Sequence, residues 1–158
     1  MTSFRELMRV LVEAGVQFII VGGAAATAHG SARLTQDLDV VYARDTANLD
    51  RIVLALSSHH CYLRGAPPGL PFTLDRRTLE RGLNFTLTSD LGDIDLLGEI
   101  VGGGGYEALI SHTVELDLFG YRCRCLDLDT LIHVKRASGR PKDFEAIAEL
   151  ILIRDAQA

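Results

Sequence analysis

Two short segments separated by thirteen residues indicate how this chain folds: FIIVGG, from Phe18 to Gly23, and DLDV, from Asp37 to Val40. The first is an apolar run rich in β-branched residues and followed by two glycines, which is typical of a buried strand that ends in a tight turn. The second alternates acidic and apolar residues. Because successive side chains of a strand point to opposite faces, Asp37 and Asp39 are predicted to share one face.

Outward from these segments, hydrophobic periodicity predicts an α+β domain with one mixed α/β-type sheet flanked by helices. Gly102 to Gly105 is expected to be a flexible loop. The predicted strands are 18–21, 38–42, 83–88, 93–97, 114–118 and 121–125, the last four forming two hairpins. The predicted helices are 4–14 with Ser3 as its cap, 24–28, one capped by Thr46, 75–80, 131–137, and a last one ending near Arg154.

Length and composition fit a single globular domain over residues 1–158. The chain is 47% apolar, enough for a core, and it lacks the roughly 20 consecutive apolar residues of a membrane span. We therefore expect a cytoplasmic protein without a membrane partner. The net charge of −5 is unusual for a protein that follows many phosphates, so any nucleic-acid contact is expected to be local or to use a basic patch. Two patches are possible, one at Arg76, Arg77 and Arg81 and one at Lys135, Arg136, Arg140 and Lys142.

Two acidic strands form the pattern most indicative of chemistry. Besides Asp37 and Asp39, the segment GDIDLL carries Asp93 and Asp95 at alternate positions. Carboxylates held close together repel each other, and a hard divalent cation such as Mg²⁺ removes that repulsion. Alone, such a pair also fits a solvated strand face, and a lone diglycine fits a simple turn. Together, the two acidic strands and a diglycine that opens a helix favour a metal and phosphate site.

The diglycine Gly22-Gly23, the Asp37-Leu38-Asp39 pair and the later Asp95 resemble the signature of the polymerase-β-like minimal nucleotidyltransferases. The resemblance covers roughly residues 18–143. Smaller features resemble small bacterial members, including relatives of the AbiEii-type toxins of toxin–antitoxin and phage-defence systems. These features are His29-Gly30, Arg33, Thr35, the segment 93–98 and the segment 135–143.

This resemblance implies specific roles for the acidic residues. Asp37 and Asp39 are expected to bind two Mg²⁺ ions, with Mn²⁺ as a substitute. Asp95 is expected to complete the metal site and to activate the acceptor hydroxyl, with Asp93 as the alternative third carboxylate. Gly22 and Gly23 are expected to hold the triphosphate of an NTP such as ATP.

Other residues are weaker candidates. Lys135 could bind the triphosphate or stabilise developing charge, or it could be an ordinary lysine on an amphipathic helix. Arg33 and Thr35 could contact phosphate, although Arg33 also fits an ordinary loop arginine. Asp143 could pair with Lys135 or Arg140, or cap the last helix.

The predicted reaction is transfer of a nucleoside monophosphate from an NTP to an acceptor hydroxyl. The toxin-like resemblance implies an RNA end as acceptor, especially the 3′ end of tRNA. The alternatives are a small molecule of the aminoglycoside kind or a protein side chain. A non-catalytic nucleotide-binding module and a metal site without nucleotide also remain open, as do a homodimer, an antitoxin or another partner chain.

Overall fold

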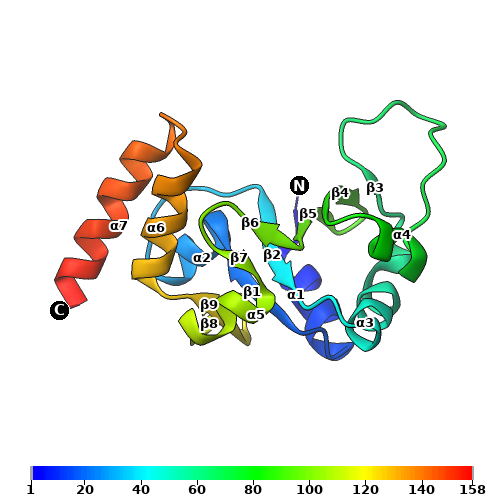
Figure 1. The fold of residues 1–158 in the computed structure, drawn as a ribbon, viewed down its shortest axis with the longest axis horizontal. Coiled ribbons are helices and arrows are strands. Elements are labelled where there is room, and N and C mark those ends of the chain that lie inside the picture. Colours follow the sequence, from blue (N-terminus) through cyan, green and yellow to red (C-terminus); the bar gives the residue numbers. More distant parts are fainter. Residues whose placement is uncertain (1, 158) are drawn as a thin grey trace.

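The structure, a computed structural model, describes residues 2–157. Its centre is a seven-stranded mixed sheet in the order β3-β4-β5-β2-β1-β9-β8, and β6 pairs with β7 in a separate ribbon (Figure 1). The strands are β1 (Phe18–Val21), β2 (Asp37–Tyr42), β3 (Tyr62–Leu63), β4 (Asn84–Ser89), β5 (Gly92–Leu97), β6 (Glu99–Ile100), β7 (Gly104–Gly105), β8 (Thr113–Leu118) and β9 (Tyr121–Leu126). The helices are α1 (Phe4–Glu13), α2 (Gly22–Ala28), α3 (Thr46–Leu56), α4 (Arg76–Arg81), α5 (Tyr106–Leu109), α6 (Leu128–Ser138) and α7 (Asp143–Gln157), with 3₁₀ turns at Ser57–His59 and Ile110–His112.

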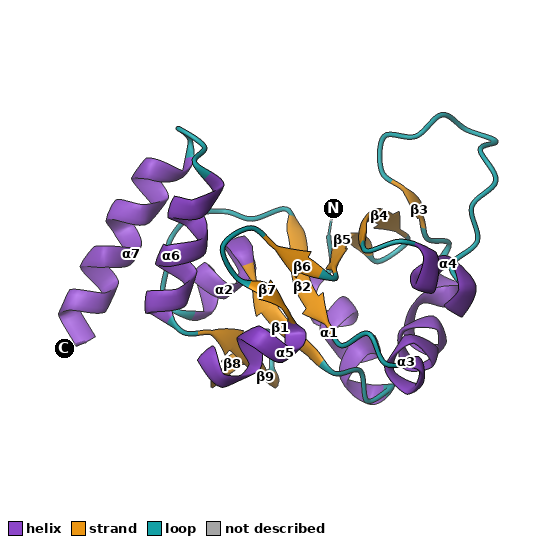
Figure 2. Ribbon diagram, in the orientation of Figure 1, coloured by secondary structure: helices purple, strands orange, loops and turns teal. Residues whose placement is uncertain are grey.

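The pairing of the strands confirms the predicted α+β class with a mixed sheet and flanking helices. β1 is antiparallel to β2 and parallel to β9, and β2 is parallel to β5. The two predicted hairpins are present as β4–β5 and β8–β9. β3 adds an edge strand beside β4, and a long loop over residues 64–75 leads from β3 to α4 (Figure 2).

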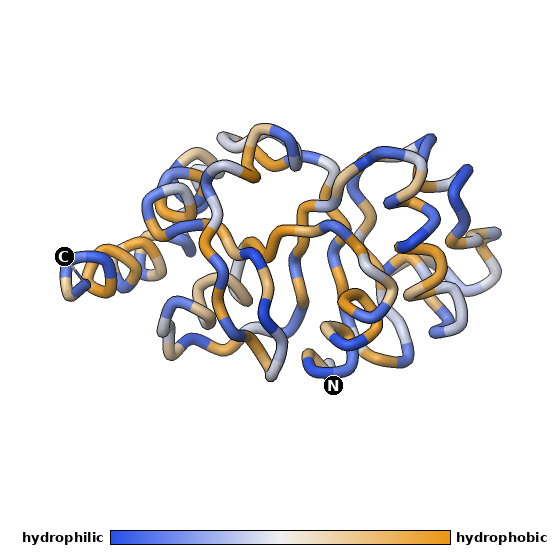
Figure 3. The backbone as a smooth tube through the Cα atoms, turned by 90° about the horizontal axis from the view of Figure 1, so that it is seen from below, coloured by the Kyte–Doolittle hydropathy of each residue, from blue (hydrophilic) through white to orange (hydrophobic). Residues whose placement is uncertain are grey.

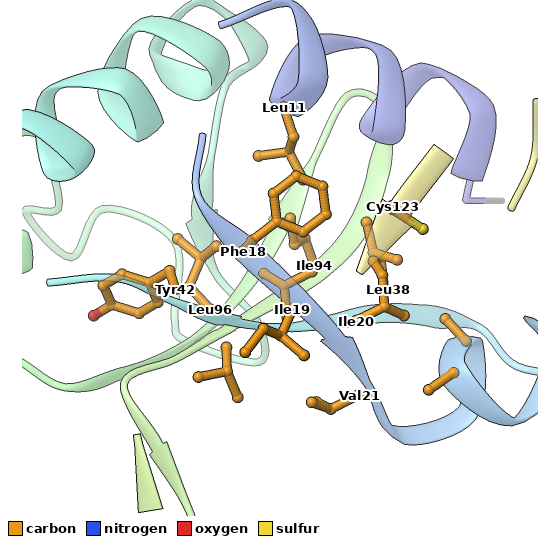
Figure 4. Close-up of a cluster of buried hydrophobic side chains, with 14 of the residues drawn as sticks. Leu11, Phe18, Ile19, Ile20, Val21, Leu38, Tyr42, Ile94, Leu96 and Cys123 are labelled. Atoms are coloured by element: carbon orange, nitrogen blue, oxygen red, sulfur yellow. The ribbon is translucent and has the colours of Figure 1, made fainter. Parts of the chain in front are cut away.

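One face of the sheet packs against the apolar side of α1. Figure 4 shows Leu11 of α1 pointing into a cluster that includes Leu38 of β2 and Ile94 and Leu96 of β5. These four side chains are almost completely buried. Apolar residues follow the strands through the middle of the molecule, and polar residues mark many of the turns (Figure 3). The core therefore fixes β2 and β5 side by side.

The helices at the two ends of the sheet form separate pairs. α3 and α4 lie at one end, and α6 and α7 lie side by side at the other, next to α2 (Figure 1). None of the helices within residues 2–157 is long and apolar enough to cross a membrane.

The structure corrects three local predictions. Helix α2 begins at Gly22 and includes the diglycine, whereas the sequence placed its start at Ala24. Asp45, not Thr46, caps α3, and its carboxylate accepts a hydrogen bond from the backbone N–H of Asn48. The glycine run was expected to be a loop, but 104–105 pairs with β6, because glycine lets the backbone turn back at Gly102, where φ is +79°.

Candidate functional site

Parallel pairing of β2 with β5 brings the two acidic segments together. Asp37 lies opposite Asp93, and Asp39 lies opposite Asp95. Alternation along both strands places the four carboxylates on the face opposite the α1 core. One oxygen from each of Asp37, Asp39 and Asp95 lies within 4.8 Å of the others. The three residues expected to bind metal therefore form one cluster, and Asp93 lies outside it.

This cluster is electrostatically unfavourable for the protein alone. Burial, followed by the charges of Asp95 and Asp37, raises the pKa of Asp39 to about 8. Burial and the charge of Asp95 also raise the pKa of Asp37, and the nearby cations of Arg64 and Lys142 oppose this shift in part. The raised pKa values mean that the protein's own cations offset the repulsion among these carboxylates only in part. Shifts of this kind are common at functional sites.

The donor set fits a hard divalent cation. Its ligand atoms are all carboxylate oxygens, which Mg²⁺ and Mn²⁺ accept. Asp39 Oδ1 is buried and has no hydrogen-bond partner within residues 2–157. Buried polar atoms are nearly always paired, so a bound cation would satisfy this oxygen.

The diglycine brings the start of α2 against the acidic strand. Gly22 has φ +63°, a conformation that favours glycine, and a Cβ there would overlap Asp39 Oδ2 and lie 3.2 Å from Asp39 Cβ. A Cβ on Gly23 would lie 2.7 Å from Thr35 Oγ1. Among residues 2–157, no side chain forms a capping hydrogen bond at the start of α2. Both glycines therefore allow a close approach that a larger residue would prevent.

Arg64 is a site residue that the sequence interpretation missed. Its guanidinium donates a hydrogen bond to Asp95 Oδ1 at 2.8 Å and another to the carbonyl of Leu87 at 2.7 Å. It also lies 3.4 Å from Asp93 and 3.6 Å from Asp37. No sequence signal marks Arg64, because its position depends on how the two-residue strand β3 pairs with β4.

A cavity of about 270 Å³ opens beside the carboxylate cluster. Gly22 and Asp39 line one side, and Lys135 of α6 lies in the wall. Other parts of the wall are apolar, with Leu97, Ile100, Val101, Leu131 and Val134 among them. The structure thus brings Lys135 to the same cavity as Gly22 and Asp39.

Two weaker candidates, Arg33 and Thr35, lie on the loop between α2 and β2. Arg33 pairs with Glu145 at 3.3 Å and Glu149 at 3.8 Å on α7, so its guanidinium ties a loop to that helix. Thr35 lies against Gly23 and donates a hydrogen bond to the carbonyl of Asp37.

Asp143 at the start of α7 accepts hydrogen bonds from Ser138 and Arg140. Burial works against its charge, but these hydrogen bonds prevail and lower its pKa. The pairing with Arg140 is one of the alternatives expected from the sequence.

Comparisons with known proteins give a likeness of fold. The sequence matches no model of a known protein family and no curated protein. The fold is similar to the crystal structure of a candidate nucleotidyltransferase from Thermotoga maritima, with a TM-score of 0.54 and 15% sequence identity. The match covers 96% of this chain and 95% of the other. At this identity, the likeness establishes that the chain has a nucleotidyltransferase-like fold.

Proposed function

We propose that the chain is one nucleotidyltransferase domain that transfers a nucleoside monophosphate from an NTP to an acceptor hydroxyl and releases pyrophosphate. The observation that carries this proposal is the cluster of Asp37, Asp39 and Asp95 directly beside the diglycine at the start of α2. The nucleotidyltransferase-like fold supports it over nearly the whole chain.

The carboxylates have distinct proposed roles. Asp37 and Asp39 hold two Mg²⁺ ions, which Mn²⁺ can replace, and Asp95 completes the site. When bound, the metal ions activate the attacking hydroxyl and stabilise the leaving pyrophosphate. Asp95 is proposed as the residue that orients the acceptor hydroxyl, because its ligand oxygen lies within the cluster and Asp93 lies outside it.

The nucleotide is proposed to lie across the diglycine and the cavity beside it. The N–H groups of Gly22 and Gly23 and the ammonium group of Lys135 bind the triphosphate, and the apolar part of the cavity receives the base and sugar. Lys142 adds a positive charge near Asp37. For Arg33 we propose only an indirect role, since α7 holds its guanidinium, and Thr35 supports Gly23.

An RNA end, such as the 3′ end of tRNA, is the proposed acceptor, which makes a toxin-like role the working hypothesis. The sheet face beside the cluster supports an extended acceptor, because Thr86, which lies opposite Asp95, is exposed. A small molecule of the aminoglycoside kind is the second candidate, favoured by the net charge of −5.

Equilibrium binding tests the nucleotide site apart from the acceptor. Titration of each NTP into the protein, with Mg²⁺ and then with EDTA, should show metal-dependent binding for at least one base. Asp39→Asn should abolish that binding, and Asp117→Asn, a matched change at an exposed position on β8, should preserve it. NTP binding that is unaffected by EDTA and by Asp39→Asn would contradict the proposal.

A further inference from the structure

The guanidinium of Arg64 lies within the carboxylate cluster itself. It reaches Asp95 at 2.8 Å, Asp93 at 3.4 Å and Asp37 at 3.6 Å. About 27% of its side chain is exposed, compared with 52% for Arg76, which pairs with the single acid Asp50. Arg64 is therefore more buried than an ordinary surface arginine, and its charge is shared among three carboxylates instead of one.

The fold holds this guanidinium in place. Leu63 of β3 lies opposite Leu87 of β4, so the next side chain, Arg64, emerges on the face of Thr86. Thr86 in turn lies opposite Asp95. A threonine at this position is small enough for the long arginine side chain to pass over β4 and reach β5, and the carbonyl of Leu87 anchors its far end.

The guanidinium of Arg64 supplies positive charge at the place where a metal ion would otherwise supply it. Like a divalent cation, it is positive and lies among oxygens of Asp37 and Asp95. Its charge relieves part of the repulsion between carboxylates that the protein would otherwise carry alone. The same charge repels any further cation that enters the cluster.

We propose that Arg64 is the resident counter-cation of the carboxylate cluster and that it weakens the binding of free divalent ions there. This inference rests on the proposed function, since it concerns the same metal site. Arg64 stabilises the metal-free cluster and leaves room for metal that arrives with an anionic triphosphate, whose negative charge offsets both cations. Nucleotide-free protein should therefore bind divalent ions weakly.

Coulomb's law sets the size of the effect. At a separation of about 5 Å, the repulsion between a divalent ion and a guanidinium weakens binding by roughly tenfold even at the dielectric constant of water. Salt reduces this value and partial burial increases it. Removal of the charge at position 64 should therefore tighten binding of a free divalent ion by about tenfold.

The test measures Mn²⁺ binding without nucleotide, using the electron paramagnetic resonance signal of free Mn²⁺. Wild type, Arg64→Gln, Arg64→Lys and the control Arg76→Gln are compared at one ionic strength. We expect Arg64→Gln to bind Mn²⁺ about tenfold more tightly than wild type. Arg76→Gln, which changes the net charge equally but lies on Asp50, should match wild type. Arg64→Lys keeps the charge and should lie closer to wild type than to Arg64→Gln.

The outcomes separate the two claims. If wild type binds Mn²⁺ and Arg64→Gln binds it equally or more weakly, the counter-cation role is wrong and the metal site stands. If neither protein binds Mn²⁺ even at millimolar concentration, the counter-cation role fails, and the titration of NTP with Mg²⁺ and with EDTA decides the proposed function separately. Should Arg64→Gln not fold, Arg64→Lys decides, because tightening by tenfold with the charge retained would overturn the electrostatic cause.

Discussion

Replacement of Gly22 by alanine probes the closest contact between the diglycine and the metal site. Gly22 has φ +63°, which costs a residue with a side chain about 1–2 kcal/mol. The new Cβ would also overlap Asp39 Oδ2 and press on Asp39 Cβ at 3.2 Å. Forcing a group into a closely packed place costs a further 1–3 kcal/mol, roughly. We therefore expect Gly22→Ala to reduce the free energy of unfolding by about 2–5 kcal/mol.

Gly139 provides a matched control for the backbone part of this cost. It has φ +66°, nearly the same as Gly22, and a Cβ there would meet nothing within 4 Å. Gly139→Ala should therefore cost only the conformational part, about 1–2 kcal/mol. The difference between the two variants isolates the displacement of Asp39.

Urea denaturation in EDTA measures both variants, and Mn²⁺ binding then reports the state of the metal site. Gly22→Ala should be less stable than Gly139→Ala and should bind Mn²⁺ at least about tenfold more weakly than wild type, because its displaced ligand no longer meets the cluster. Equal destabilisation by the two variants, together with wild-type Mn²⁺ binding by Gly22→Ala, would show that a side chain at position 22 does not displace Asp39.

Three further predictions concern individual side chains. Burial raises the pKa of Asp39 to about 8, whereas an unfolded aspartate ionises near 4, so the folded state holds a proton that the unfolded state has lost between these pH values. In EDTA, the free energy of unfolding should therefore fall as pH rises through this window. Asp39→Asn should flatten this pH dependence and stabilise the protein at pH 8. Urea denaturation curves from pH 5 to 9 measure both effects, and an unchanged slope in Asp39→Asn contradicts the prediction. Asp95→Asn should reduce turnover more than about a hundredfold and Asp93→Asn less than tenfold, and the reverse order in steady-state assays would assign the third carboxylate to Asp93. Lys135→Met should raise the KM for the NTP about tenfold or more, because a charge-assisted contact is lost. Arg136 is a neighbouring exposed cation, and Arg136→Gln should change the KM by less than about twofold. Equal KM values for the two variants would place Lys135 outside the site.

The part of the candidate site that depends on alternation along one strand could be predicted from local sequence. Asp37 and Asp39 share a face because a strand repeats every two residues, and this needs no knowledge of the rest of the fold. The hairpin of β4 and β5 follows from the turn residues between two apolar runs. The resemblance to nucleotidyltransferases then pointed to Asp95, which the structure places in the cluster.

Features that depend on long-range register could not be predicted. Arg64 enters the cluster only because β3 adds to the edge of β4, and the sequence around it reads as the start of a loop. Arg33 was a candidate either for phosphate contact or for an ordinary loop arginine, and local sequence could not predict its partners Glu145 and Glu149, which lie more than a hundred residues later on α7. Gly22 was expected in a turn, whereas its positive φ lets α2 begin there against Asp39.

Transfer of label from α-labelled NTPs is the decisive test of metal-dependent nucleotidyltransfer by this chain. Wild type, Asp37→Ala and the control Asp117→Asn are each incubated with Mg²⁺, the four NTPs in turn, and total bacterial RNA. We expect labelled RNA with wild type and Asp117→Asn but none with Asp37→Ala or in EDTA, and the size of the labelled band narrows the acceptor. Parallel reactions offer small molecules or proteins in place of RNA, and label in these alone would retain the enzyme and change its acceptor. Transfer by Asp37→Ala at the wild-type rate would exclude the proposed metal site, and no transfer to any acceptor together with no NTP binding would exclude nucleotidyltransfer by this chain.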